Sequence, residues 1–149
     1  MIYTMTITTK DGSEVIEIGK LQEDNKDERT AITDIEINID TIDDNVRNKS
    51  NAVLAKIKIC GELKDFLTER LMKIFKWSCE YDEEKWYRTI EIEVKTSNGK
   101  VIRTYIFTDV FVVDYKEIYK ADGKNAESSR FELYLTQKEN NLNKIDTFN

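Results

Sequence analysis

The sequence predicts a mainly β protein with α+β character: a small antiparallel β-barrel or sandwich of about seven strands, with one central amphipathic helix packed on it. Segments in which apolar and polar residues alternate, as in half-buried strands, recur along most of the chain. Asp-Gly and Asn-Gly pairs, which favour tight hairpin turns, separate two pairs of these segments. In one stretch near the middle the apolar period changes to three or four residues, which predicts a helix.

The first half of the chain supplies four of the expected strands. Tyr3–Thr9 alternates apolar residues with threonine, and an Asp-Gly turn joins it to Val15–Ile18. The polar stretch 19–30 is expected to be an exposed loop. Ala31–Asp40 and Val53–Cys60 follow as strands with every second residue apolar, separated by a second polar connection.

The helix is expected between Glu62 and Glu80, after Gly61, which should end the preceding strand. Its apolar residues recur at spacings of three and four: Leu63, Phe66, Leu67, Leu71, Ile74 and Phe75. We predict that Leu67, Leu71 and Ile74 pack on the strands as the core face of this helix.

Three further strands are expected in the second half. Trp86–Thr96 leads through an Asn-Gly turn into Val101–Glu117, the segment richest in β-forming residues. Both alternating registers of that segment are largely apolar, and Thr108-Asp109 interrupts it where a bulge or bend is expected. Phe131–Lys138 closes the hairpin, and 140–149 is expected to be a mobile tail.

Length and composition bound the class of protein. A chain of 149 residues with 40% hydrophobic residues is expected to form one domain over 1–149. The net charge of −6 argues against binding to a nucleic-acid backbone. No long apolar run and no signal-peptide pattern is present. We therefore expect that the protein is synthesised in the cytoplasm and does not insert into a membrane. Cys60 and Cys79 allow one disulfide, but without a secretory signal we expect two reduced, packed thiols.

Residues suited to catalysis or cofactor binding are scarce. The chain has no histidine, the commonest general base and zinc ligand, and its five glycines form no phosphate-binding loop. The acidic stretches 40–44 and 80–84 lack the EF-hand pattern. Trp77, Trp86 and Tyr87 suit packing in the core or between subunits better than ligand stacking. We therefore predict no catalytic residues, no metal and no cofactor.

The chain also contains no proline. Edge strands of β proteins commonly carry proline or another device that blocks pairing with a second sheet. One interpretation is that the edge strands pair with other copies of the chain; the other is that a composition rich in Ile, Lys and Asn leaves proline scarce.

Residues 107–117, FTDVFVVDYKE, are followed by a polar loop and by FELYLT at 131–136. This pattern resembles the last hairpin of the inner-tube proteins of contractile injection machines. These are the Hcp (haemolysin-coregulated) proteins of type VI secretion and the tail-tube proteins of contractile phage tails and phage-tail-like particles. Val110 stands where their pattern has alanine. The order of the preceding elements is also similar to their small barrel with one helix.

The resemblance implies a non-enzymatic building block. Such proteins close into rings, commonly hexamers, that stack into a tube around a channel, and their partners are sheath and baseplate or spike proteins. In a ring of head-to-tail contacts, unblocked strand edges become assembly surfaces. Because both registers of Val101–Val113 are apolar, we predict that part of this stretch faces another subunit. The candidate interface residues are Phe107, Val110, Phe111, Val112 and Tyr115.

Two alternatives stay open. The chain is equally compatible with a tube-initiator or other baseplate component of the same machine. A monomeric small barrel that binds a ligand such as a flavin is the alternative from another class. That site would need basic groups gathered for phosphate, and the only candidates are Lys56, Lys58 and Arg103, whose spacing does not support one site.

Overall fold

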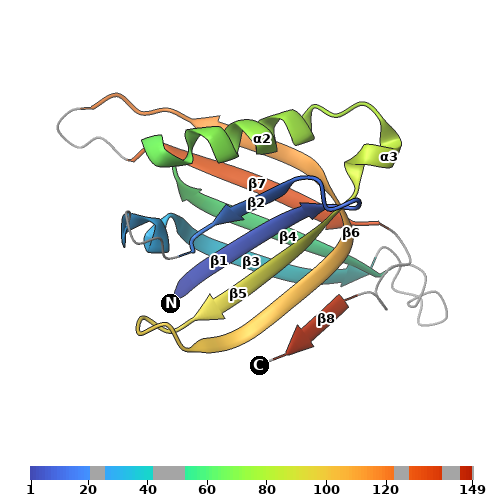
Figure 1. Ribbon diagram of the computed structural model, residues 1–149, viewed down its shortest axis with the longest axis horizontal. Coiled ribbons are helices and arrows are strands. Elements are labelled where there is room, and N and C mark those ends of the chain that lie inside the picture. Colours follow the sequence, from blue (N-terminus) through green and yellow to red (C-terminus); the bar gives the residue numbers. More distant parts are fainter. Residues whose placement is uncertain (21–25, 42–52, 123–127, 139–144, 149) are drawn as a thin grey trace.

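The computed structural model describes residues 1–20, 26–41, 53–122, 128–138 and 145–148, which form one eight-stranded antiparallel sheet with a helix across one end (Figure 1). The strands are β1 (Ile2–Thr9), β2 (Val15–Ile18), β3 (Ile32–Thr41), β4 (Val53–Glu62), β5 (Arg88–Lys95), β6 (Val101–Ile118), β7 (Arg130–Gln137) and β8 (Ile145–Phe148). The helical segments are η1 (Lys26–Thr30), η3 (Asp65–Leu67), α2 (Thr68–Ser78) and α3 (Glu83–Trp86). The predicted mainly β architecture with a central helix is confirmed.

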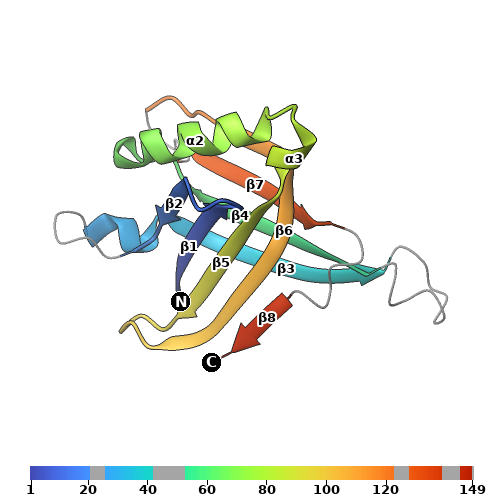
Figure 2. The same cartoon turned by 45° about the vertical axis from the view of Figure 1, so that its right-hand side comes forward.

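The sheet is organised around β6. The strand order is β2-β1-β5-β6-β7-β4-β3, and β8 pairs with β6 outside this path. The first part of β6 pairs with β5, and the part from Val110 onward pairs with β7. Two views show β1 and β5 crossing in front of β3 and β4, so the sheet folds over itself around a core (Figures 1 and 2). In the described part of the chain β2 and β3 do not pair with each other, and the sheet is not closed.

A bend in β6 occurs at Asp109, as predicted. Asp109 has a φ of 53°, in the left-handed region that non-glycine residues seldom adopt. Asp tolerates this conformation better than most residues. Neighbouring groups hold the bend: the backbone N–H of Lys138 donates to the Asp109 carbonyl at 2.8 Å, and Gln137 Nε2 donates to the Thr108 carbonyl at 3.0 Å.

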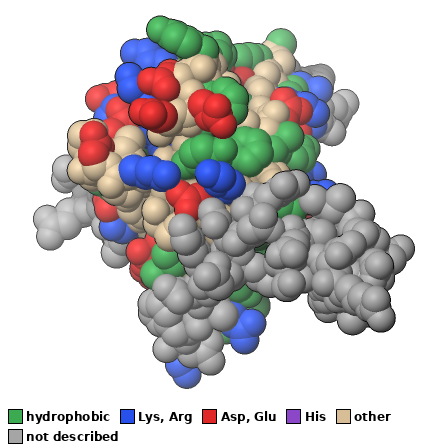
Figure 3. Space-filling model, turned by 90° about the vertical axis from the view of Figure 1, so that its right-hand side faces the viewer, with side chains coloured by type: hydrophobic (Ala, Val, Ile, Leu, Met, Phe, Trp, Pro, Cys, Tyr) green, Lys and Arg blue, Asp and Glu red, His purple; other side chains and the backbone are tan. Residues whose placement is uncertain are grey.

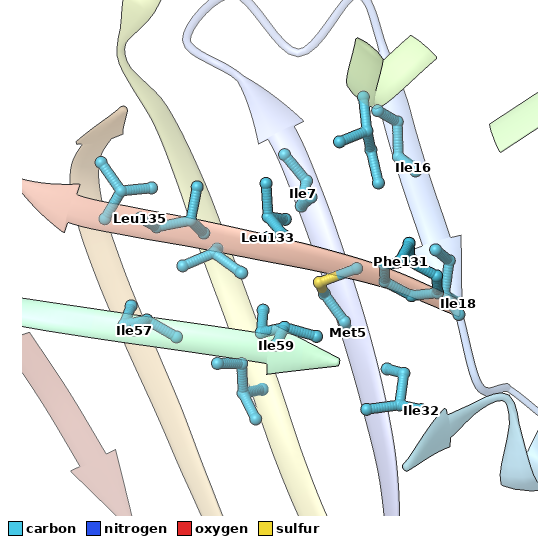
Figure 4. Packing of buried hydrophobic residues seen from close by; sticks show 14 of the residues in the cluster. Met5, Ile7, Ile16, Ile18, Ile32, Ile57, Ile59, Phe131, Leu133 and Leu135 are labelled. Carbon is cyan, nitrogen blue, oxygen red and sulfur yellow. The ribbon is translucent and has the colours of Figure 1, made fainter. Parts of the chain in front are cut away.

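The core lies between the folded halves of the sheet and beneath α2. Isoleucine and leucine side chains from β1, β4 and β7 interdigitate there (Figure 4). Leu67 of η3 and Leu71 and Ile74 of α2 are buried against them, so the helical segment covers one end of the core.

The helical segment differs in detail from the sequence prediction. It begins with η3 and continues as α2 only from Thr68 to Ser78. Phe75, expected on the buried face, is half exposed, whereas Trp77 is buried and donates its Nε1–H to the Trp86 carbonyl at 2.8 Å. Trp77 can be buried because the Trp86 carbonyl of α3 accepts its N–H. The apolar periodicity of α2 alone does not predict this hydrogen bond.

Three connections also differ from the prediction. Gly61 does not end the preceding strand but pairs with Ile32 and Phe131 inside β4. The predicted loop at 19–30 contains η1, and the tail predicted to be mobile contains β8. The pairing of β8 has a physical reason. β7 pairs with only the second half of one edge of β6, which leaves the first half of that edge for β8.

Candidate assembly surfaces

The predicted interface residues do not share one surface. Phe107 and Val110 are 1% and 0% exposed and lie in the core of the single chain. An interface role for these two side chains is therefore wrong. The reason is the bend: one extra residue at Asp109 shifts the alternation, so that residues 107 and 110 both face inward.

The other three residues are half-buried. Val112 and Tyr115 pair with core residues of β7 and pack against the core from its margin. Phe111 pairs with Thr136 and contacts the Tyr87 ring edge to face, with ring centroids 5.9 Å apart. These three positions retain accessible surface, and their role at an interface stays a prediction.

Phe111 belongs to a surface at the bend of β6, called here the bend surface, which comprises Lys10, Trp86, Tyr87, Phe111 and Lys138. The Nζ atoms of Lys10 and Lys138 lie 5.3 and 5.2 Å from the centre of the Tyr87 ring. A hollow of about 240 Å³ beside it is lined by Trp86 and Phe111, among others. Figure 3 shows hydrophobic side chains beside basic and acidic ones on the side of the molecule where β6 bends.

A second surface runs along α2. This α2 groove has a volume of about 390 Å³ and is lined by apolar, polar and charged side chains of α2, β6 and the adjoining segments: Leu63, Lys64, Asp65, Thr68, Leu71, Met72, Phe75, Glu117, Tyr119 and Ser129. Met72, Phe75 and Tyr119 are 51%, 49% and 73% exposed, which is unusual for large apolar side chains that lie together.

Glu117 is held in this groove by two tyrosines. The hydroxyl of Tyr115 donates to Glu117 Oε1 at 2.8 Å, and that of Tyr119 donates to Oε2 at 2.6 Å. Burial, together with the bond to Glu117, raises the pKa of Tyr115. The bond to Glu117 raises the pKa of the exposed Tyr119. Both carboxylate oxygens therefore have fixed positions at the groove.

The two cysteines are free and occupy different environments. Cys60 is buried, and burial raises the pKa of its thiol to about 11, whereas Cys79 is exposed just after α2. The expectation of packed thiols therefore fails for Cys79. Within the described residues, no group of three or more His, Cys, Asp or Glu side chains is arranged to hold a metal ion.

The three basic residues considered for phosphate binding are not brought together by strand pairing. Lys56 and Lys58 lie on β4, which pairs with β7, and the Nζ of Lys58 lies 5.5 Å from the centre of the Tyr134 ring. Arg103 lies on the half of β6 that pairs with β5 instead. This arrangement gives no support to a flavin site built on these residues.

A buried ion pair connects η1 to α2. Glu28 is almost fully buried, and its carboxylate contacts the guanidinium of Arg70. The same guanidinium donates to the carbonyls of Glu17 at 2.8 Å and Phe66 at 3.1 Å. Glu28 lies in the stretch 19–30, for which the sequence predicts an exposed loop. A charged residue in a polar run carries no signal of a partner 42 residues away, so sequence reasoning missed this contact.

Within the described residues, no helix has the length and hydrophobicity needed to cross a bilayer. No protein-family model matches the sequence. No curated protein matches it significantly either. Among solved structures, by contrast, the chain is similar to proteins of contractile injection systems.

Three of these structures are representative. Hcp1 from Salmonella typhimurium has a TM-score of 0.58 and 17% identity, over 91% of this chain and 81% of that chain. A crystal structure of an Hcp protein has a TM-score of 0.61 and 8% identity, over 100% of this chain and 99% of that chain. A chain of the sheath/tube terminator of the PVC extracellular contractile injection system has a TM-score of 0.53 and 13% identity, over 97% of this chain and 93% of that chain. The chain thus has the fold of Hcp and related contractile-system proteins.

Proposed function

We propose that this protein is a structural subunit of the inner tube of a contractile injection machine. In this proposal the chain closes into a homo-oligomeric ring, most simply a hexamer, and the rings stack into a tube around a channel. Its other partners are sheath and baseplate or spike proteins, and it is made in the cytoplasm before assembly into a phage-tail-like or injection particle. The observation that carries the proposal is the similarity of fold to two Hcp proteins, over 91% and 100% of this chain and over 81% and 99% of theirs.

The chemistry of the described residues supports a building block instead of an enzyme. The α2 groove is open, and its charged side chains are engaged in an ion pair or hydrogen bonds: Lys64, Asp65 and Glu117. The outer edges of β2 and β3 have no partner strand in the described part of the chain. Such edges can pair with a neighbouring copy, which is the use expected of them in a ring.

The test is the size of the purified protein. We expect sedimentation and light scattering to show a ring well above the 17.5 kDa of one chain, and electron microscopy to show rings and short tubes at high concentration. A colourless or yellow species that stays monomeric over a wide range of concentration would contradict the proposal. The yellow monomer would favour the flavin-binding alternative.

A second role in the same machine also has support. One similar structure is described as a sheath/tube terminator, and another, with a TM-score of 0.50, as a baseplate. A tube-initiator or other end component would form single rings that do not stack. Rings that lengthen into tubes in the absence of other proteins would favour the tube subunit over this end component.

A further inference from the structure

The α2 groove carries two carboxylates, Asp65 and Glu117, that form no direct ion pair with another described residue. Glu117 accepts hydrogen bonds from two tyrosine hydroxyls, and Asp65 accepts one from the backbone N–H of Phe66 at 2.9 Å. Lys64, which lies beside Asp65 and also lines the groove, pairs with Glu62 at 2.8 Å, and Lys116, which lies beside Glu117 in the sequence, pairs with Asp114 at 3.8 Å. Because Met72, Phe75 and Tyr119 give the groove an exposed apolar wall beside these carboxylates, the groove suits a segment that is both apolar and cationic.

The tip of the β5–β6 hairpin has these complementary properties. Residues 96–103, called here the hairpin tip, contain Lys100, Arg103 and no acidic residue. Val101 and Ile102 lie between the two cations and are both exposed. Among the described residues, neither Lys100 nor Arg103 forms an ion pair, and Arg29 adds a third cation by donating to the Ser97 carbonyl at 2.9 Å.

The two features lie at opposite ends of the molecule. Figures 1 and 2 show α2 at the top and the β5–β6 turn at the bottom. A single chain therefore cannot bring them together, but two chains can. A contact between two different surfaces of identical chains is head-to-tail, and it repeats around a ring if the rotation closes.

We propose that the hairpin tip of one copy docks into the α2 groove of the next copy, with Arg103 against Glu117 and with Val101 and Ile102 against the apolar wall. This inference rests on the proposed function and names the two surfaces that would form the contact between neighbouring subunits of the ring. Arginine suits this position because its planar guanidinium pairs with both oxygens of a carboxylate. The Glu117 carboxylate is already oriented by Tyr115 and Tyr119, so little order is lost on pairing.

Charge reversal tests this contact. Glu117→Arg and Arg103→Glu each place like charges opposite one another, so the protein concentration at half-assembly should rise about tenfold or more. The double variant restores an opposite pair and should assemble at a concentration closer to that of the wild type. Glu83→Arg on α3 and Lys76→Glu on α2 change exposed residues outside the α2 groove, the hairpin tip and the bend surface, so they are the matched controls and should leave assembly unchanged. Sedimentation measures assembly, and circular dichroism checks the fold of each variant.

The outcomes separate this inference from the proposed function. If the wild type forms rings and the single reversals assemble as the controls do, the docking contact is wrong. It is equally wrong if only Glu117→Arg weakens assembly, or if the double variant is no better than the singles. If Glu117→Arg does not fold, Glu117→Gln replaces it, because glutamine keeps the shape of the side chain and removes the charge. Glu117→Gln should weaken assembly and make assembly less dependent on salt. Unchanged salt dependence would refute the proposed pair of Arg103 and Glu117. A wild type that never forms rings refutes the proposed function itself, and this contact with it.

Discussion

Lys10 and Asp109 form an ion pair across the bend of β6, with Lys10 Nζ 3.1 Å from Asp109 Oδ1. Lys10 lies just after β1, whereas Asp109 is the residue at which β6 turns from β5 toward β7. The pair therefore connects the β1–β2 turn to the middle of the sheet. It also places a cation beside the Tyr87 ring of the bend surface.

The backbone at Asp109 should matter more than its charge. Asp109→Val should lower the free energy of unfolding by about 1–3 kcal/mol, because a β-branched residue is strained at positive φ. Asp109→Gly should cost less, since glycine adopts this conformation freely although it also loses the ion pair. Urea denaturation of the two variants gives the comparison, and equal stability would contradict a backbone requirement at the bend.

Leu71 and Lys73 lie on the same helix and should respond very differently to truncation. Leu71→Ala should destabilise the fold by about 2–5 kcal/mol, as expected for a large-to-small change in a packed core. Lys73→Ala should change stability by less than about 0.5 kcal/mol. Thermal or urea unfolding measures both, and similar losses would mean that the buried face of α2 is assigned incorrectly.

Val110 and Phe111 are neighbours on opposite faces of β6. Val110→Glu should prevent folding, because the introduced carboxylate would be buried without a partner. Phe111→Glu should keep a native circular dichroism spectrum and reduce ring formation, because its side chain lies on the bend surface. Tyr81→Glu, at a highly exposed aromatic residue, is the control. Unchanged rings in Phe111→Glu would remove the bend surface from the interface.

Gly61 should not tolerate a side chain. A Cβ at this position would lie 2.5 Å from both the Ala31 carbonyl oxygen and the Phe131 ring. Gly61→Ala should therefore destabilise the protein by about 1–3 kcal/mol or more through overpacking. A denaturation curve that matches the wild type would show that the Ala31 carbonyl and the Phe131 ring can move away from this position.

The two thiols should differ in reactivity. Cys79 is exposed and should react quickly with a thiol reagent at neutral pH. Cys60 is buried with its pKa raised to about 11, so it should react only when the protein unfolds. Counting modified thiols by mass spectrometry before and after denaturation gives the test, and rapid labelling of both residues in the native protein would contradict the burial of Cys60.

The strands were accessible to sequence reasoning because alternation reports directly which face is buried. This worked for β1, β4 and β7, where every second residue enters the core. It fails at Val110, because the extra residue at the Asp109 bend shifts the side-chain alternation and turns Val110 into the core. An inserted residue reverses every assignment that follows it.

The sequence patterns did not predict the side-chain contacts between different elements of the fold. Trp77 is buried because α3 supplies the Trp86 carbonyl, and Glu28 is buried because Arg70 reaches it from α2. The same limit applies to the α2 groove. Glu117 belongs to β6 and Met72 to α2, and neither stretch of sequence indicates that the other lies beside it.

The pairing of β4 with β7 has a consequence for how the chain reaches this structure. Gly61 pairs with Phe131 although α2, α3, β5 and β6 all lie between them in the chain. β1 likewise pairs with β5 across the first half of the sequence. Such non-local pairings require loop closure before they gain any stabilisation, so high contact order should make folding slow, in the range of milliseconds to seconds. Newly made chains would then expose unpaired strands for that time, and chaperone binding during synthesis would limit their premature association.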